Sequence, residues 1–389
     1  MPDATNTDVG VVELVDRMLA GAIARRASDV HFEPEDTVMR VRYRLDGLLH
    51  DVDVLPGTLS QGVIARLKVL AGLLTYRPDI PQEGSFTMNG RASVEGPPID
   101  VRVATFPTVR GERAVLRLLY GAGPVSGLDA LGLRPEMVAS LRQAAEQPAG
   151  LILVTGPAGS GKSTTLYALA RHIMTATPGR SVVSLEDPVE QRINGMAQIQ
   201  VTPHGELNYP RAMRSLLRQD VQVLLVGEIR DAETAHIVVE AALTGHLIMS
   251  TLHSGDPAEA LVRLLEMGIA PYQVVGAVSV VSSQRLLRTV CPACHADRRD
   301  GDRSHAGPPA RAVACETCAG TGYQGRTACG QIAVMDERLR QAVLRQAPAG
   351  ELRRLIAGAG PDLIADARRV LAEEHTTREE LLRVFGSVD

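Results

Sequence analysis

LILVTGPAGSGKSTTLYALARHIM, residues 151–174, is the stretch that decides the fold of this 389-residue chain. Its opening, LILVT, is almost entirely apolar and predicts a strand buried on both faces, whereas its end, STTLYALARHIM, favours a helix. Between them, GPAGSGKS at 156–163 fits the pattern GxxxxGK[ST] of a phosphate-binding loop. Because a strand and a helix flank the loop as this pattern requires, we interpret it as a P-loop and not as a glycine-rich turn that matches by chance.

Each residue type in this loop serves phosphate binding. Glycines let backbone N–H groups approach phosphate oxygens, Lys162 would reach the β- and γ-phosphates, and the Ser163 hydroxyl would ligate Mg²⁺. We therefore predict that the chain binds ATP and Mg²⁺. The predicted nucleotide-binding residues are Gly156, Pro157, Ala158, Gly159, Ser160, Gly161, Lys162, Ser163 and Thr164.

Three more apolar runs follow the P-loop and alternate with helical segments. They are SVVSL (181–185), VQVLLV (221–226) and LIMST (247–251). Near-continuous apolar strands separated by helices predict an α/β fold with a parallel sheet covered on both faces. Ligands of such sheets bind beyond the carboxyl ends of the strands, and the polar motifs of this chain fall there.

Acidic residues and a histidine follow these strands. The second strand ends in SLEDPVE with Glu186, which we predict to orient the water that attacks the nucleotide. The third ends in LLVGEIRD with Glu228, which is expected to hold the Mg²⁺ shell as a Walker-B acid. His253 follows the fourth strand, where a sensor of the γ-phosphate would lie, and His246, before that strand, is a second candidate.

The first 120 residues have a different pattern. Apolar residues at helical spacing predict a helix over 11–26, and alternation over 39–45 followed by Asp46-Gly47 predicts a β-hairpin. Two more strand-like runs, DVRVATF and RAVLRLL, flank a turn. The chain is therefore predicted to contain a small α+β domain (1–120), a glycine-rich linker (121–132), an ATPase domain (133–290), a tetracysteine subdomain (291–330) and C-terminal helices (331–389).

Two CxxC knuckles lie twenty residues apart in the subdomain. Four thiolates at this spacing suit a tetrahedral structural zinc ion, and a cytosolic setting disfavours disulfides. Four unliganded thiols are the alternative; His295 and His305 fit the ligand pattern less well, and Cys329 is expected to be a buried thiol. The predicted zinc ligands are Cys291, Cys294, Cys315 and Cys318.

The composition of the chain restricts the classes of protein to which it can belong. Hydrophobic residues make up 45% of the chain and charged residues 22%, which is typical of globular proteins. The net charge of −4 argues against direct nucleic-acid binding. The polar, acidic start does not resemble a signal peptide, and no apolar run approaches the roughly 18 residues of a membrane helix. We expect a cytoplasmic protein without a transmembrane segment, which reaches a membrane only through partners.

Taken together, these motifs resemble the type II secretion and type IV pilus assembly ATPase family. The family's Walker A motif, Asp box, Walker B motif and His box correspond to 156–163, 184–190, 221–231 and 246–256. The resemblance implies a RecA-like ATPase domain and hexameric rings, with ATP held between the small domain of one subunit and the RecA-like domain of its neighbour. Other matching segments are ASDVHFEP, VRYRLDG, DVRVATFPTVRGERAVLRLL, RSLLRQD and QRLLRTVCPAC.

The same resemblance gives a role to two arginines of the small domain. Arg102 and Arg117 match family arginines that reach the γ-phosphate in the closed ring, as arginine fingers do. Because Arg117 interrupts an apolar run, we expect its guanidinium to be buried and to need a partner. The alternative for each is an arginine on the strand surface, held in a salt bridge.

The predicted function is that of a Mg²⁺-dependent ATPase, a hexameric motor that powers pseudopilus or pilus assembly for protein secretion. It would act at the cytoplasmic face of the inner membrane, with platform proteins as partners. A DNA-export or conjugation ATPase, a pilus retraction ATPase and a non-enzymatic nucleotide-binding regulator are alternatives. The chain departs from the family in Asp220-Val221-Gln222, HSGD (253–256) and GRTACGQ (325–331), and we expect it to be a member shortened at its N-terminus.

Overall fold

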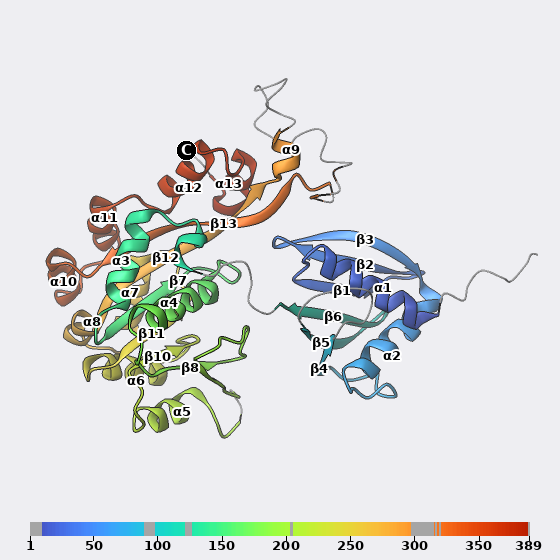
Figure 1. Cartoon of the computed structure of the whole chain (residues 1–389), viewed down its shortest axis with the longest axis horizontal. Helices are drawn as coiled ribbons and strands as arrows, with labels where there is room; N and C mark the ends of the chain where they lie inside the picture. The colour runs from blue at the N-terminus through green and yellow to red at the C-terminus, as the bar shows by residue number, and fades with distance from the viewer. Residues whose placement is uncertain are drawn as a thin grey trace, which may run out of the picture. The chain divides into compact units, whose positions relative to one another are not determined.

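The computed structural model describes residues 10–88, 98–120, 127–202, 205–296, 315, 317, 318 and 320–387. The chain divides into two compact units, Met1–Gly123 and Pro124–Asp389 (Figure 1). The first half of the segment predicted as a linker, residues 121–126, lies outside the described residues. Its end forms a 3₁₀ helix, η2 (Leu128–Leu131), whose buried leucines join the core of the second unit.

The first unit is built on a six-stranded antiparallel sheet in the order β3-β2-β1-β6-β5-β4. The predicted hairpin is confirmed: Asp46 and Gly47 both have positive φ, 46° and 90°, as a tight two-residue turn requires. The elements are α1 (Val11–Ala24), β1 (Asp29–Pro34), β2 (Val38–Leu45), β3 (Leu48–Pro56), η1 (Gly57–Leu59), α2 (Ser60–Leu70), β4 (Gln82–Met88), β5 (Ile99–Thr108) and β6 (Gly111–Leu119).

Alternate residues of these strands face opposite sides of the sheet. One side packs against α1 and α2 around buried residues such as Phe32 and Leu116. The other side carries a row of polar residues from four neighbouring strands, paired in register: Arg44, Asp29, Arg117 and Arg102. The small domain therefore presents a charged sheet face opposite its core.

The second unit contains a seven-stranded sheet in the order β13-β12-β7-β11-β10-β8-β9, in which β13 alone pairs antiparallel. The parallel sheet that the sequence predicts is confirmed, and the four predicted runs form β7, β8, β10 and β11. The strands are β7 (Gly150–Thr155), β8 (Val182–Glu186), β9 (Ala197–Gln200), β10 (Val223–Val226), β11 (Leu247–Leu252), β12 (Val278–Val290) and β13 (Tyr323–Val334).

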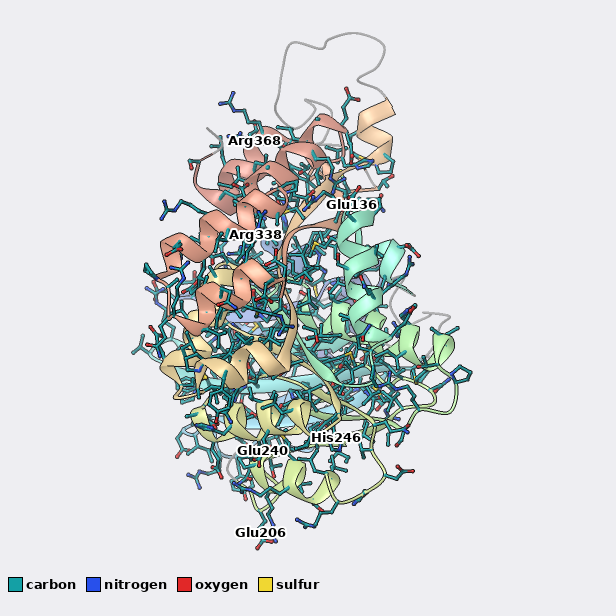
Figure 2. All side chains as sticks on the ribbon, turned by 90° about the vertical axis from the view of Figure 1, so that its left-hand side faces the viewer. Glu136, Glu206, Glu240, His246, Arg338 and Arg368 are labelled. Atoms are coloured by element: carbon teal, nitrogen blue, oxygen red, sulfur yellow. The ribbon has the colours of Figure 1, made fainter. Side chains whose placement is uncertain are left out.

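Helices cover both faces of this sheet, as its continuous apolar strands require. One core lies under α5–α8, α10 and α11, and the other lies under α3 and α4. Figure 2 shows α3, which carries Glu136, and the C-terminal helices on different sides of the sheet. The helices are α3 (Pro135–Ala145), α4 (Lys162–Ala176), α5 (Tyr209–Leu216), α6 (Ala232–Leu243), α7 (Pro257–Glu266), α8 (Pro271–Ala277), α9 (Pro292–Ala296), α10 (Glu337–Leu344), α11 (Ala349–Ala359), α12 (Leu363–Ala372) and α13 (Arg378–Phe385).

Strands β12 and β13 form a long antiparallel ribbon that extends from the sheet to the cysteine knuckles (Figure 1). A buried ion-pair cluster fixes α13 to this ribbon. Glu380 is fully buried and accepts hydrogen bonds from Arg288 of β12, at 2.7 Å, and from Arg383 of its own helix, also at 2.7 Å. Burial alone would raise the pKa of Glu380, but the bonds from Arg383 and Arg288 outweigh burial and lower the pKa.

Candidate active site

The P-loop joins the end of β7 to the start of α4 and has the backbone that a phosphate cradle needs. Gly156, Gly159 and Gly161 have φ values of 142°, 73° and 87°, which residues with a side chain rarely adopt. A Cβ atom on Gly156 would lie 2.6 Å from the carbonyl oxygen of Gln284, so the loop also passes too close to β12 for a larger residue. The helix behind the loop then begins at Lys162, with its free N–H groups facing the loop.

The ammonium group of Lys162 lies across the loop. Its Nζ donates hydrogen bonds to the carbonyl oxygens of Gly156 and Pro157, both at 2.9 Å. Burial lowers the pKa of Lys162, and the neighbouring charge of Glu228 partly opposes this shift. Ser163 follows on the first turn of α4, where a hydroxyl oxygen suits Mg²⁺ coordination.

Glu228 and His253 form the second part of the site, at the carboxyl ends of β10 and β11. The Nε2 atom of His253 lies 3.1 Å from a carboxylate oxygen of Glu228. The other oxygen of Glu228 pairs with Arg230, and this hydrogen bond raises the pKa of Arg230. The Glu228 side chain is 18% exposed and the His253 side chain 49% exposed, so both groups are accessible to a ligand at this edge.

Glu186 is the last residue of β8 and lies at the same edge, but its setting is more enclosed. It is only 4% exposed, and it accepts hydrogen bonds from Tyr167, from Ser184 at 2.5 Å and from Gln198 at 3.1 Å. Burial, followed by the charge of Glu186, raises the pKa of Tyr167. Ser184 lies two residues before Glu186 on the same strand, whereas Tyr167 of α4 and Gln198 of β9 come close to Glu186 only in the folded domain.

His246 lies at the other edge of the sheet. It precedes β11 and its Nδ1 atom is 3.2 Å from the carbonyl oxygen of Ala241, at the end of α6 (Figure 2, where Glu240 marks that helix). His253 lies beyond the carboxyl end of the same six-residue strand. A strand of this length separates its two ends by about 20 Å, so the structure does not bring His246 to the phosphate loop.

The two predicted arginine fingers belong to the first unit. Arg102 and Arg117 are paired in register on β5 and β6. The expectation that Arg117 is buried is wrong: its side chain is 67% exposed and pairs with the buried carboxylate of Asp29 at 3.1 Å. Arg102 is half-buried, and its side chain has no hydrogen bond or ion pair with any described residue. These two guanidinium groups therefore stand on the open face of the sheet.

The four knuckle cysteines converge at the end of the ribbon. Their sulfur atoms all lie within 4.8 Å of one another, with Cys291 and Cys315 at 3.9 Å and Cys294 and Cys318 at 3.7 Å. Zinc–sulfur bonds of 2.3 Å in a tetrahedron give sulfur separations of about 3.8 Å, so the geometry fits a zinc ion. Residues 297–314, including His305, lie outside the described part of the chain.

The fifth cysteine is separate from this cluster. Cys329 lies on β13, is fully buried, and has its pKa raised to about 12 by burial. Its sulfur lies 3.7 Å from the carbonyl oxygen of Arg285. This setting agrees with an unreactive core thiol.

Comparison with known proteins shows the family. Residues 4–383 match the family described as type II/IV secretion system protein. The chain belongs to this family. It is 39% identical over 381 residues to the type II secretion system protein HxcR of Pseudomonas aeruginosa. The alignment covers 98% of this chain and 78% of HxcR.

Two further proteins extend the comparison. The type IV pilus assembly ATPase PilB of Thermus thermophilus is 38% identical to this chain over 382 residues. The alignment covers 95% of this chain and 42% of PilB. The solved structure of the ATPase DotB of Legionella pneumophila has a similar fold, with a TM-score of 0.74 at 22% identity, covering 100% of this chain and 99% of DotB. None of the described helices is long and apolar enough to cross a membrane.

Proposed function

We propose that this protein is an ATPase motor that powers assembly of a pseudopilus or pilus for protein secretion. The observation that carries the proposal is the meeting of the P-loop with Glu228 and His253 at one edge of the parallel sheet. Membership of the type II/IV secretion system family supports the same function, because its relatives include a protein named as a pilus assembly ATPase.

Within this site, the phosphate chain of ATP would bind in the P-loop. The backbone N–H groups of Gly159, Gly161 and Lys162 would donate to phosphate oxygens, and the Lys162 ammonium would turn from its two carbonyl partners to the β- and γ-phosphates. Ser163 would hold Mg²⁺ with its hydroxyl oxygen. The bound ion would supply positive charge that offsets the negative charge of the phosphates.

Glu228, His253 and Glu186 would have different roles in ATP hydrolysis. Glu228, whose carboxylate faces His253, would hold the Mg²⁺ shell, and His253 would contact the γ-phosphate. Glu186 is buried, and Tyr167, Ser184 and Gln198 take three of the four acceptor positions of its carboxylate, so it would orient the attacking water only after these surroundings open. We therefore infer that Glu186 becomes available to water on nucleotide binding and is withheld from it otherwise.

The motor would work as a homo-hexamer at the cytoplasmic face of the inner membrane, in contact with platform proteins. Arg102 and Arg117 would complete the ATP site of a neighbouring subunit. Support for this role comes from the open sheet face on which both stand and from the lack of any described partner for the Arg102 side chain. The zinc ion would have a structural role and hold the end of the β12–β13 ribbon.

The test of this proposal is nucleotide hydrolysis by the purified full chain. ATP turnover should require Mg²⁺, be abolished by Lys162→Ala and be slowed strongly by Glu186→Gln while ATP still binds. His246→Ala is the matched control, because it removes a polar residue from the opposite edge of the same sheet and should leave turnover unchanged. Wild-type turnover in the Glu186→Gln protein would show that another group orients the water.

A further inference from the structure

A glutamine on β12 lies directly beside the P-loop. Strand β12 runs parallel to β7, with Ser283 opposite Thr155, so that the next residue, Gln284, comes beside Gly156. Alternation along the strand turns the Gln284 side chain toward the sheet face that α4 covers. Gln284 is only 1% exposed, and none of the catalytic roles proposed above uses it.

Both ends of the Gln284 amide are bound to the nucleotide-binding segment. Its Nε2 atom donates to the carbonyl oxygen of Ser160 at 2.8 Å, and its Oε1 atom accepts from the hydroxyl of Thr165 at 2.9 Å. The carbonyl oxygen of Ser160 can only accept a hydrogen bond, which fixes the amide orientation. Glutamine is suited to this position because it supplies a donor and an acceptor on one side chain.

The bond to Ser160 has a consequence for the neighbouring peptide group. The carbonyl of Ser160 and the N–H of Gly161 belong to one planar trans peptide and point in opposite directions. When Gln284 holds the carbonyl toward β12, it therefore turns the Gly161 N–H away from β12 and toward the phosphate side of the loop. We propose that Gln284 is a positioning residue of the nucleotide site, which aligns the Gly161 amide for phosphate binding.

The packing around the loop supports this role. A Cβ atom on Gly161 would lie 3.1 Å from Nε2 of Gln284, so the loop has little space in which to rotate this peptide. The residues on either side of Gln284 hold the loop that carries His253: Ser283 and Arg285 both donate to the carbonyl oxygen of Gly255, at 3.1 Å each. One segment of β12 thus fixes two loops of the proposed ATPase site.

This inference rests on the proposed function, and its test measures binding and not turnover. The full chain is titrated with the fluorescent nucleotide mant-ADP. Gln284→Met keeps the length of the side chain but loses both hydrogen bonds, and we expect about a tenfold rise in Kd. Ser282→Ala is the matched control, because Ser282 is fully buried on the same strand and its hydroxyl has no hydrogen-bond partner among the described residues. This variant should bind with wild-type affinity.

A second variant separates orientation from simple loss of packing. In Gln284→Glu, burial should raise the pKa of the new carboxyl group, and its protonated form again offers one donor and one acceptor. Mant-ADP affinity relative to wild type should therefore recover as the pH falls from 8 to 6, whereas the Gln284→Met deficit should stay constant. Wild-type affinity in both variants would overturn the inference. Failure of the wild-type protein to bind mant-ADP would instead overturn the proposed function, together with this role for Gln284.

Discussion

A subunit-mixing experiment tests whether the arginines of the small domain serve a neighbouring subunit. One population of subunits carries Arg102→Ala and Arg117→Ala, and the other carries Lys162→Ala. Each is expected to be inactive alone, because an arginine finger contributes about 10³–10⁵ to the rate in other phosphoryl-transfer enzymes and the P-loop lysine contacts the phosphates directly.

The structure predicts that the arginine changes leave the fold intact. Arg102 has no partner in the described part of the chain, so its loss should change the free energy of unfolding by less than about 0.5 kcal/mol. Arg117 is largely exposed, and its partner Asp29 keeps a second ion pair, with Arg44 at 3.2 Å. Because Arg117 is exposed and Arg44 still pairs with the Asp29 carboxylate, the loss of Arg117 should cost about 1 kcal/mol or less. A fall in activity of a thousandfold could not then result from unfolding.

The size of the rescue follows from the symmetry of the proposed hexameric ring. In rings assembled from equal amounts of both populations, about one interface in four joins an intact P-loop to intact arginines of the neighbour. ATP turnover should therefore recover to about a quarter of the wild-type rate, or to less if the six sites act cooperatively. Turnover is measured by phosphate release, in rings shown by sizing to contain both populations.

A matched control places all three changes in one population and mixes it with Lys162→Ala subunits. No interface in those rings has an intact P-loop, so activity should stay at background. If the original mixture also stayed at background, although mixed rings had formed, Arg102 and Arg117 would act within their own chain or serve only the structure of the small domain.

Two more predictions concern the ribbon. Elemental analysis should find about one zinc ion per chain. The variant Cys291→Ser should lose the zinc ion and have a lower thermal unfolding temperature, whereas the control Cys329→Ala should retain the ion. Zinc that persists in a variant without the four knuckle cysteines would contradict the assignment. Because the folded-state pKa of Glu380 lies below its ordinary value of 4.5, its contribution to stability is complete above that pH and is lost as the pH falls through the folded value. The difference in urea midpoint between wild type and Glu380→Gln should thus shrink between pH 7 and pH 3; an unchanged difference would contradict this reasoning.

The sequence predicted those features that depend on short-range patterns. The P-loop, the apolar strands and the Asp46-Gly47 turn are each encoded within a few neighbouring residues, and the structure contains all of them. The burial of Arg117 was predicted wrongly because the apolar run around it was treated as buried on both faces. In the antiparallel sheet, Leu116 and Leu118 face the core, and the residue between them must face the opposite side.

The partners of the polar residues could not be predicted in the same way. Gln284 and Thr165 are 119 positions apart, and Arg288 and Glu380 are 92 apart. No local sequence pattern predicts either pair, because the fold decides which residues come into contact. Tyr167 and Gln198, two of the donors around Glu186, were missed for the same reason. Sequence motifs thus predicted the residues of the candidate site, whereas most of the groups that contact those residues became visible only in the folded structure.

The length of β12 would let this strand transmit movement between the proposed nucleotide site and the proposed zinc site. The strand is thirteen residues long and carries Gln284 beside the phosphate loop, the Glu380 partner Arg288 further along, and Cys291 directly after its end. Seven residues of strand span about 23 Å, so a tilt of about 10° at Gln284 would displace Cys291 by about 4 Å. A small change in the loop around phosphate would thereby become a movement large enough for a neighbouring protein to detect, provided that the ribbon stays stiff. The zinc ion and the clamp by α13 are the features that would keep it stiff.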